Sequence, residues 1–173
     1  FMQLFKSKYR TDSLRLKSWD YSLSGFYYVT ICVLNHKHSF GFIENELVNL
    51  NGLGHAASRF FLEIPEHFNN VSIANHIIMP NHIHGIIVIN KEEKIQGEKC
   101  NSRSLKGHKK GSLSVIISQY KAAVKRFAVK NNMDFNWQDS YYEHIIRDEK
   151  SMVKISEYIR LNPLRWELDE YNI

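Results

Sequence analysis

The stretch that decides the fold runs Met79-Pro80-Asn81-His82-Ile83-His84-Gly85-Ile86-Ile87-Val88-Ile89. Its apolar tail, rich in Ile and Val, predicts a buried strand, and residues two apart in a strand share one face. His82 and His84 therefore lie side by side. Two neutral imidazoles on one rigid face can chelate a divalent metal and leave coordination positions open for other ligands. The alternative for either ring is a strand-end histidine bonded to the backbone.

The neighbouring sequence predicts the sheet around this strand. Ile77-Ile78-Met79 precedes the break at Pro80-Asn81, so two strands joined by a tight turn form a hairpin with the histidines just after it. The run 26–34 is rich in β-branched and aromatic residues and predicts a central strand. Residues 39–43 predict a short strand that can pair with 26–34. Between these runs, His36 and His38 repeat the His-x-His spacing, but they fall in a polar turn without a rigid face.

Helix spacing recurs three times along the chain. Apolar residues at three- and four-residue steps predict helices over 46–68, from 113 onward with Ser112 as N-cap, and from Glu149 to about Leu161. Residues 135–147 mix aromatic with polar side chains and include a last strand. This order favours an α+β fold, a ferredoxin-like sandwich with a mostly antiparallel sheet and the helices on one face.

Composition sets the class of protein. The 173 residues are 43% hydrophobic and 13% aromatic, which predicts a single domain over 1–173 with a real core. No apolar run reaches membrane-spanning length, and we expect a cytoplasmic protein with no membrane partner. The spacing of Cys32 and Cys100 indicates neither a disulfide framework nor a zinc knuckle.

The formal net charge is +5, and much of the basic charge gathers in two segments, an N-terminal arm over 1–23 and a flexible loop over 90–111. Local basic runs indicate a polyanion such as nucleic acid, although solvated loops carry the same pattern. Trp137 and Tyr141 could stack on unpaired bases or fill the core. The basic residues predicted to contact DNA are Lys6, Lys8, Arg10, Arg15, Lys17, Arg103, Lys106, Lys109, Lys110, Lys121 and Lys125.

The last predicted helix supplies what the histidine pair lacks. Tyr158 and Asn162 lie four residues apart and so project from one helix face. If that face meets the histidine strand, Asn162 can offer an amide oxygen to a metal and Tyr158 a phenol as nucleophile. Both residues also have a purely structural interpretation. Tyr158 could be a half-buried aromatic residue of the helix, and Asn162 could be the C-cap before Pro163. Tyr120 is the rival nucleophile, in an apolar setting that favours packing.

At this point the chain resembles the single-tyrosine transposases of the IS200/IS605 type, and above all their REP-associated relatives within the HUH nucleases. The resemblance rests on three separated motifs in the right order and covers nearly the whole chain. They are Met79-Pro80-Asn81-His82-Ile83-His84, Trp137-Gln138 with Tyr141-Tyr142-Glu143-His144-Ile145-Ile146-Arg147, and Tyr158-Ile159-Arg160-Leu161-Asn162-Pro163.

The resemblance implies a transposase that cleaves single-stranded or hairpin DNA and rejoins it through a 5′-phosphotyrosine intermediate. It implies Tyr158 as catalytic nucleophile and His82, His84 and Asn162 as metal ligands, with Asn162 where other members have Gln. Mixed nitrogen and oxygen ligands suit Mg²⁺ or Mn²⁺.

Other readings stay open at this stage. One is a domesticated hairpin-DNA-binding protein without cleavage activity. Another is a cupin-type metalloenzyme, disfavoured because that architecture is all-β. The family includes homodimers with tyrosines acting across the pair and monomers, and no stretch of this sequence decides between them.

Overall fold

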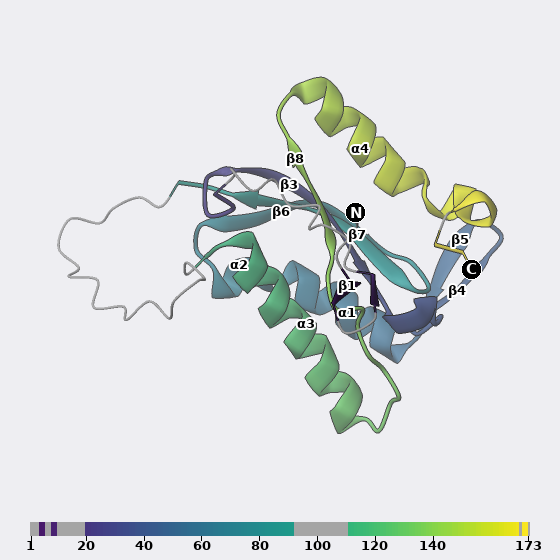
Figure 1. Ribbon diagram of the computed structural model, residues 1–173. Helices are drawn as coiled ribbons and strands as arrows, with labels where there is room; N and C mark the ends of the chain where they lie inside the picture. Colours follow the sequence, from purple (N-terminus) through teal and green to yellow (C-terminus); the bar gives the residue numbers. More distant parts are fainter. Residues whose placement is uncertain (1–3, 6–7, 10–19, 92–110, 170, 173) are drawn as a thin grey trace.

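The computed structural model describes residues 4–5, 8–9, 20–91, 111–169 and 171–172. Its centre is a four-stranded antiparallel sheet with strand order β6-β7-β3-β8 (Figure 1). The strands are β3 Gly25–Cys32, β6 Val71–Ile78, β7 His82–Ile89 and β8 Tyr142–Ile146. The predicted hairpin is confirmed, since β6 and β7 pair and the Met79 N–H donates to the His82 carbonyl across the turn at 2.9 Å.

The register of β3 against β7 assigns side chains to the two faces of the sheet. Thr30 pairs with His84 and Cys32 pairs with His82. Directly opposed residues of antiparallel strands share a face. The even-numbered residues of both strands therefore point to one side, and the odd-numbered residues to the other.

The odd-numbered face carries the main core. Helices α1 Gly52–Leu62, α2 Ile64–His67 and α3 Leu113–Lys130 bury their apolar residues there. Phe61 of α1 packs so tightly over Gly85 of β7 that a Cβ at Gly85 would lie 2.3 Å from the Phe61 ring. This close approach explains a glycine in an otherwise branched apolar strand.

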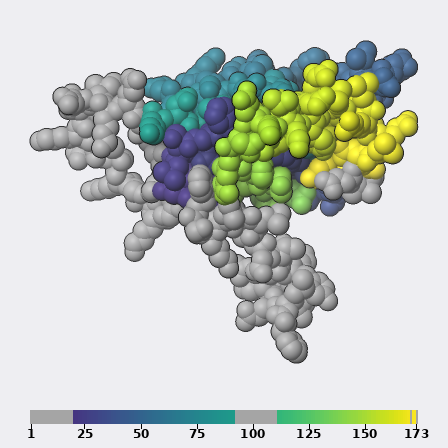
Figure 2. All heavy atoms as spheres, turned by 90° about the horizontal axis from the view of Figure 1, so that it is seen from above, coloured from purple at the N-terminus to yellow at the C-terminus, as the bar shows by residue number. Residues whose placement is uncertain are grey.

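The even-numbered face is covered by α4 Glu149–Leu161. A second, smaller core joins Ile159 of α4 to Tyr28, Ile86 and Ile146 of the sheet. Figure 2 looks down on this face and shows α4 and the C-terminal residues, yellow-green to yellow, lying across it. The predicted α+β fold with an antiparallel sheet is confirmed. The prediction that all helices lie on one face is wrong for α4, because the central strands are apolar on both faces and need cover on both.

Residues 39–50 differ from the sequence prediction. They form a separate hairpin, β4 Gly41–Glu44 with β5 Leu47–Leu50, so β4 does not pair with β3 and the helix predicted over 46–68 begins later. Asn45 and Glu46 turn the chain with φ of 49° and 64°. Asn51 then caps α1, its Oδ1 accepting from the Leu53 and Gly54 N–H groups at 3.0 Å. Leu47 and Leu50 fit helix spacing by coincidence.

Four short elements complete the described chain: β1 Leu4–Phe5, β2 Lys8–Tyr9, η1 Leu34–His36 and η2 Pro163–Leu168. The predicted basic arm over 1–23 and loop over 90–111 lie largely outside the described residues. Among the helices that the structure describes, none has the length and apolarity needed to cross a bilayer.

Candidate metal centre and tyrosine site

The two histidines of β7 meet beneath the C-terminal end of α4. Both rings are fully buried, and the Nε2 atoms of His82 and His84 lie 2.9 Å apart. The strand alternation predicted this pairing, and here both Nε2 atoms point to one place. Two imidazole nitrogens so close together could supply two of the ligands of a metal ion.

A carboxylate completes the group. Asp169, directly after η2, brings one oxygen to the histidines, and the three candidate ligand atoms all lie within 4.8 Å of one another. Ligands bonded at ~2.1 Å to one cation lie roughly 3 to 4 Å from each other, so small shifts would suffice. The set of two nitrogens and one oxygen fits a divalent metal, so these residues could hold one.

Asn162, the C-cap residue of α4, contacts Asp169 of this group. Its side chain is 1% exposed, and its Nδ2 donates to Asp169 Oδ2 at 3.0 Å. Its Oδ1 is buried and accepts no hydrogen bond from the described residues. Leaving a buried carbonyl oxygen unbonded costs about 1–3 kcal/mol. A buried oxygen without a partner, on the residue that holds Asp169, could serve as a further donor to a cation.

Tyr158 lies one turn before Asn162 on α4 and contacts one of the two histidines. Its ring packs edge-on against His84, with ring centroids 5.3 Å apart and planes at 63°. The residue is 36% exposed, whereas His84 beneath it has no exposed surface. The phenol therefore borders both the candidate metal group and the outside of the molecule.

Burial keeps both histidines uncharged. Removal from water lowers the pKa of His82 to about 2, with His84 and His36 as lesser causes, and lowers the pKa of His84 to about 3. Neutral imidazole is the form that ligates a metal. Both rings are thus in the protonation state that a metal would require across the physiological pH range.

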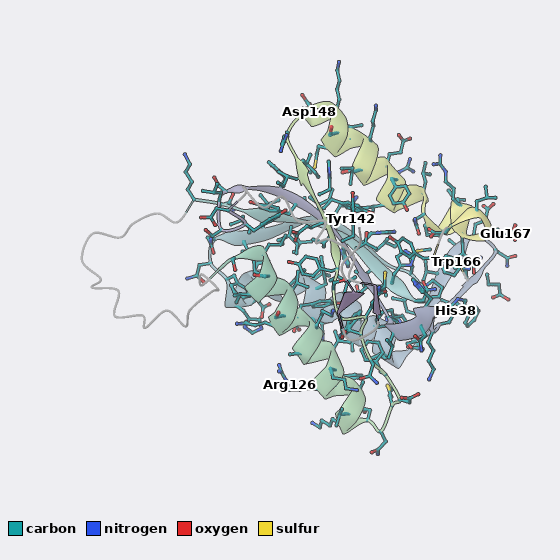
Figure 3. The ribbon with its side chains drawn as sticks, viewed as in Figure 1. His38, Arg126, Tyr142, Asp148, Trp166 and Glu167 are labelled. Carbon is teal, nitrogen blue, oxygen red and sulfur yellow. The ribbon has the colours of Figure 1, made fainter. Side chains whose placement is uncertain are left out.

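The C-terminal residues close over the histidines. The Tyr171 ring lies 4.7 Å from His82, and the Tyr171 N–H donates to Asp169 Oδ1 at 2.8 Å. His36 stacks on Tyr171 with centroids 5.8 Å apart, and His38 packs on Trp166 at 5.5 Å; Figure 3 labels His38 and Trp166 at this end. The second His-x-His pair thus borders the centre and supports the residues that cover it.

Known proteins resemble this chain at two levels, in sequence and in fold. No family model matches the chain. The chain is 44% identical over 166 residues to an uncharacterized protein of Haemophilus influenzae (strain Rd), and the match covers 91% of both. The chain belongs to the same family as that protein.

The fold places that family among known structures. A solved REP-associated tyrosine transposase bound to a REP hairpin superposes with a TM-score of 0.60 at 14% identity, over 90% of this chain and 77% of that chain. The resemblance to single-tyrosine transposases drawn from the motifs is confirmed at the level of the fold. This chain shares the fold of that protein, and in this chain a His-His-Asp group lies beside a helix tyrosine.

Four of the residues predicted to contact DNA have described side chains: Lys121, Lys125, Trp137 and Tyr141. Lys6, Arg10, Arg15, Lys17, Arg103, Lys106, Lys109 and Lys110 fall outside the described residues, and only the backbone of Lys8 is described. Lys121 and Lys125 of α3 donate to carbonyls of Gln138 and Phe135, bracing the segment after α3. The Trp137 Nε1–H donates to the Lys121 carbonyl at 3.0 Å, and Trp137 and Tyr141 pack against the main core. That these residues contact DNA stays a prediction.

Sequence reasoning missed several residues of the centre. The position of Asp169 in the sequence does not indicate that it lies near β7. A 3-10 helix and a reversal of the chain bring it back to the histidines. Tyr28 and Thr30, whose hydroxyls lie 2.8 and 3.0 Å from His84 Nδ1, were part of an apolar strand pattern. The predicted pairing of this strand with the histidine strand could have found them.

Proposed function

We propose that this protein is a metal-dependent transposase-type enzyme that cleaves and rejoins single-stranded or hairpin DNA, with Tyr158 as nucleophile. The observation that carries the proposal is the edge contact between the Tyr158 ring and buried His84, at 5.3 Å within one chain. A half-exposed phenol above a group of metal-type ligands suits attack on a phosphodiester from outside.

The proposed ligands are His82, His84 and Asp169, with the Asn162 amide oxygen as a further donor. A divalent cation bound there would polarise the scissile phosphate and favour loss of the phenol proton, whose pKa is ordinarily about 10. Mg²⁺ or Mn²⁺ is proposed because the donors mix nitrogen and oxygen. Asn162 has a second role, since its Nδ2 holds the Asp169 carboxylate in place.

The proposed reaction replaces one phosphoester bond by another of similar energy. Tyr158 Oη forms a bond to phosphorus and gives up its proton, while the bond from phosphorus to the 3′ oxygen breaks and that oxygen leaves as a hydroxyl. The 5′ phosphate is then held as a phosphotyrosine. A 3′ hydroxyl from another strand can reverse the step, so rejoining requires no nucleotide hydrolysis.

The proposed substrate is unpaired or hairpin DNA. The solved transposase with this fold is bound to a REP hairpin, which supports a hairpin ligand here. The basic charge of the chain supports a polyanion partner as well. Binding measurements with a panel of hairpin and unpaired oligonucleotides would show which of the two this protein prefers.

The decisive experiment is adduct formation. We expect a labelled oligonucleotide incubated with the protein and Mn²⁺ to become covalently attached, and expect Tyr158→Phe and His82→Ala to abolish the attachment. Tyr120→Phe is the matched control, because the Tyr120 hydroxyl is buried on α3 and donates to the Ala57 carbonyl at 3.0 Å. It should form the adduct like the wild type.

Two results would count against the proposal. An adduct that persists in Tyr158→Phe and vanishes in Tyr120→Phe would mean that the wrong tyrosine was chosen. Strong, salt-sensitive binding to hairpins with no adduct in Mn²⁺ or Mg²⁺ would favour a DNA-binding protein without cleavage activity.

A further inference from the structure

The inward nitrogen of His84 faces two buried hydroxyl groups. Its Nδ1 lies 2.8 Å from the Tyr28 hydroxyl and 3.0 Å from Thr30 Oγ1, and Thr30 Oγ1 donates to the Tyr28 oxygen at 3.2 Å. Tyr28 and Thr30 both belong to β3, and both are buried. Hydroxyls differ from most hydrogen-bonding side chains because each can donate or accept.

The tautomer of His82 follows from its neighbour. Asn81 Nδ2 donates to the carbonyls of His36 and Tyr171, at 3.1 and 2.6 Å, so Asn81 Oδ1 is an acceptor. His82 Nδ1 lies 2.8 Å from that oxygen and must donate to it. Since the ring is neutral, its Nε2 carries a lone pair.

His84 must meet the same requirement. To bind a cation, its Nε2 needs a lone pair, so a neutral His84 that binds one carries its proton on Nδ1. The hydroxyl oxygens of Tyr28 and Thr30 lie within hydrogen-bond distance of that Nδ1, at 2.8 and 3.0 Å.

We propose that Tyr28 and Thr30 are positioning residues that hold His84 in the Nδ1–H tautomer and so leave the lone pair of its Nε2 for a metal. Either hydroxyl oxygen can accept a hydrogen bond from that Nδ1–H. This inference rests on the proposed metal site, and not on DNA cleavage.

Burial of Tyr28 supports this role. Desolvation, with neighbouring phenols as lesser causes, raises the Tyr28 pKa well above its ordinary value, so the hydroxyl keeps its proton at physiological pH. The Tyr28 ring also lies edge-on to Tyr158, with centroids 6.5 Å apart. Tyr28→Phe keeps that ring contact and removes only the hydroxyl.

The first test measures Mn²⁺ affinity by electron paramagnetic resonance, without DNA. We expect the dissociation constant to rise about tenfold in Tyr28→Phe and about a hundredfold in the double variant with Thr30→Val, since either hydroxyl can partly replace the other. Tyr120→Phe also deletes a buried phenolic hydroxyl, but on the far side of the sheet, and should leave the affinity unchanged. Equal affinities for wild type and the double variant, or no Mn²⁺ binding by the wild type, would overturn the proposal.

The second test determines the tautomer directly in the unsubstituted protein. Long-range ¹H–¹⁵N correlation spectra of the protein saturated with diamagnetic Mg²⁺ should assign both His82 and His84 as Nδ1–H. A His84 in the Nε2–H form under these conditions would overturn the inference. Both expected results without any DNA adduct would uphold this inference while refuting the proposed nuclease.

Discussion

At the scale of single residues, burial of the two histidines lowers the stability of the folded protein in acid. The same burial keeps both rings in the neutral form that could bind a metal. Burial keeps them neutral in the folded protein, with pKa values of about 2 for His82 and about 3 for His84, whereas in the unfolded chain each titrates near 6.5. Below the unfolded pKa the unfolded state therefore binds protons that the folded state does not.

The sign of this linkage gives a prediction. The contribution is fully present above about pH 6.5 and is lost as pH falls toward the folded values, at up to about 1.4 kcal/mol per pH unit for each ring. Urea unfolding without metal, compared between about pH 7 and about pH 5, measures it. His82→Gln should show a shallower loss than the wild type. Identical slopes would mean that the histidines do not drive the acid sensitivity.

Asp169 gives a second prediction at this scale. Asp169→Asn keeps the shape of the side chain but removes the charge that attracts a cation. We expect Mn²⁺ affinity to fall at least about tenfold, as for loss of a metal-site contact. Glu167→Gln is the control, since Glu167 is exposed on η2 and lies outside the three-residue group (Figure 3). Equal losses in both variants would point to general surface charge in place of ligation.

At the scale of elements, β7 serves both faces of the sheet. Its even positions present His82 and His84 to the pocket, and its odd positions pack against α1 and α3. Gly85, directly after His84, lets Phe61 of α1 approach the strand. The packing of α1 and the position of the candidate metal ligands therefore depend on the same few residues.

Gly85→Ala tests this dependence. The new methyl would lie 2.3 Å from Phe61, so we expect a loss of about 1–3 kcal/mol in the free energy of unfolding from overpacking. Gly52→Ala at the start of α1 is the matched control, because a Cβ there meets nothing within 4 Å. Chemical denaturation of both variants measures the difference. An unchanged stability in Gly85→Ala would mean that α1 can move away at little cost.

At the scale of the whole molecule, the tyrosine helix lies on its own sheet. Only Arg147 and Asp148 separate β8 from α4, and Asp148 caps the helix by accepting from the Ser151 N–H at 2.9 Å. With so short a link, the chain that supplies the histidines also supplies Tyr158. This arrangement favours a site complete within one chain.

A mixing experiment tests the arrangement. Tyr158→Phe and His82→Ala each lack one half of the proposed site. We expect an equimolar mixture of the two to form no adduct with labelled DNA, as each variant does alone. Restored adduct in the mixture would mean that α4 serves a second copy. Mixing each variant with wild type controls for inhibition.

Local periodicity in the sequence was enough to predict most strands and helices and which residues share a face. The two-residue repeat of β7 placed both histidines on one face, and the four-residue step from Tyr158 to Asn162 placed a phenol and an amide on one side of α4. The central sheet, the β6–β7 hairpin and three of the helices followed from the same patterns, because those periods arise from backbone geometry alone.

Which side chains and elements contact one another became apparent from the three-dimensional structure. Helix spacing could not reveal that Asn45 and Glu46 turn the chain back into a β4–β5 hairpin, because Leu47 and Leu50 satisfy either pattern. Nor could spacing bring Asp169 to the histidines, or give α4 the opposite face of the sheet from α1 and α3. Such contacts join residues distant in sequence, and they form because both apolar faces of one sheet must be covered at once.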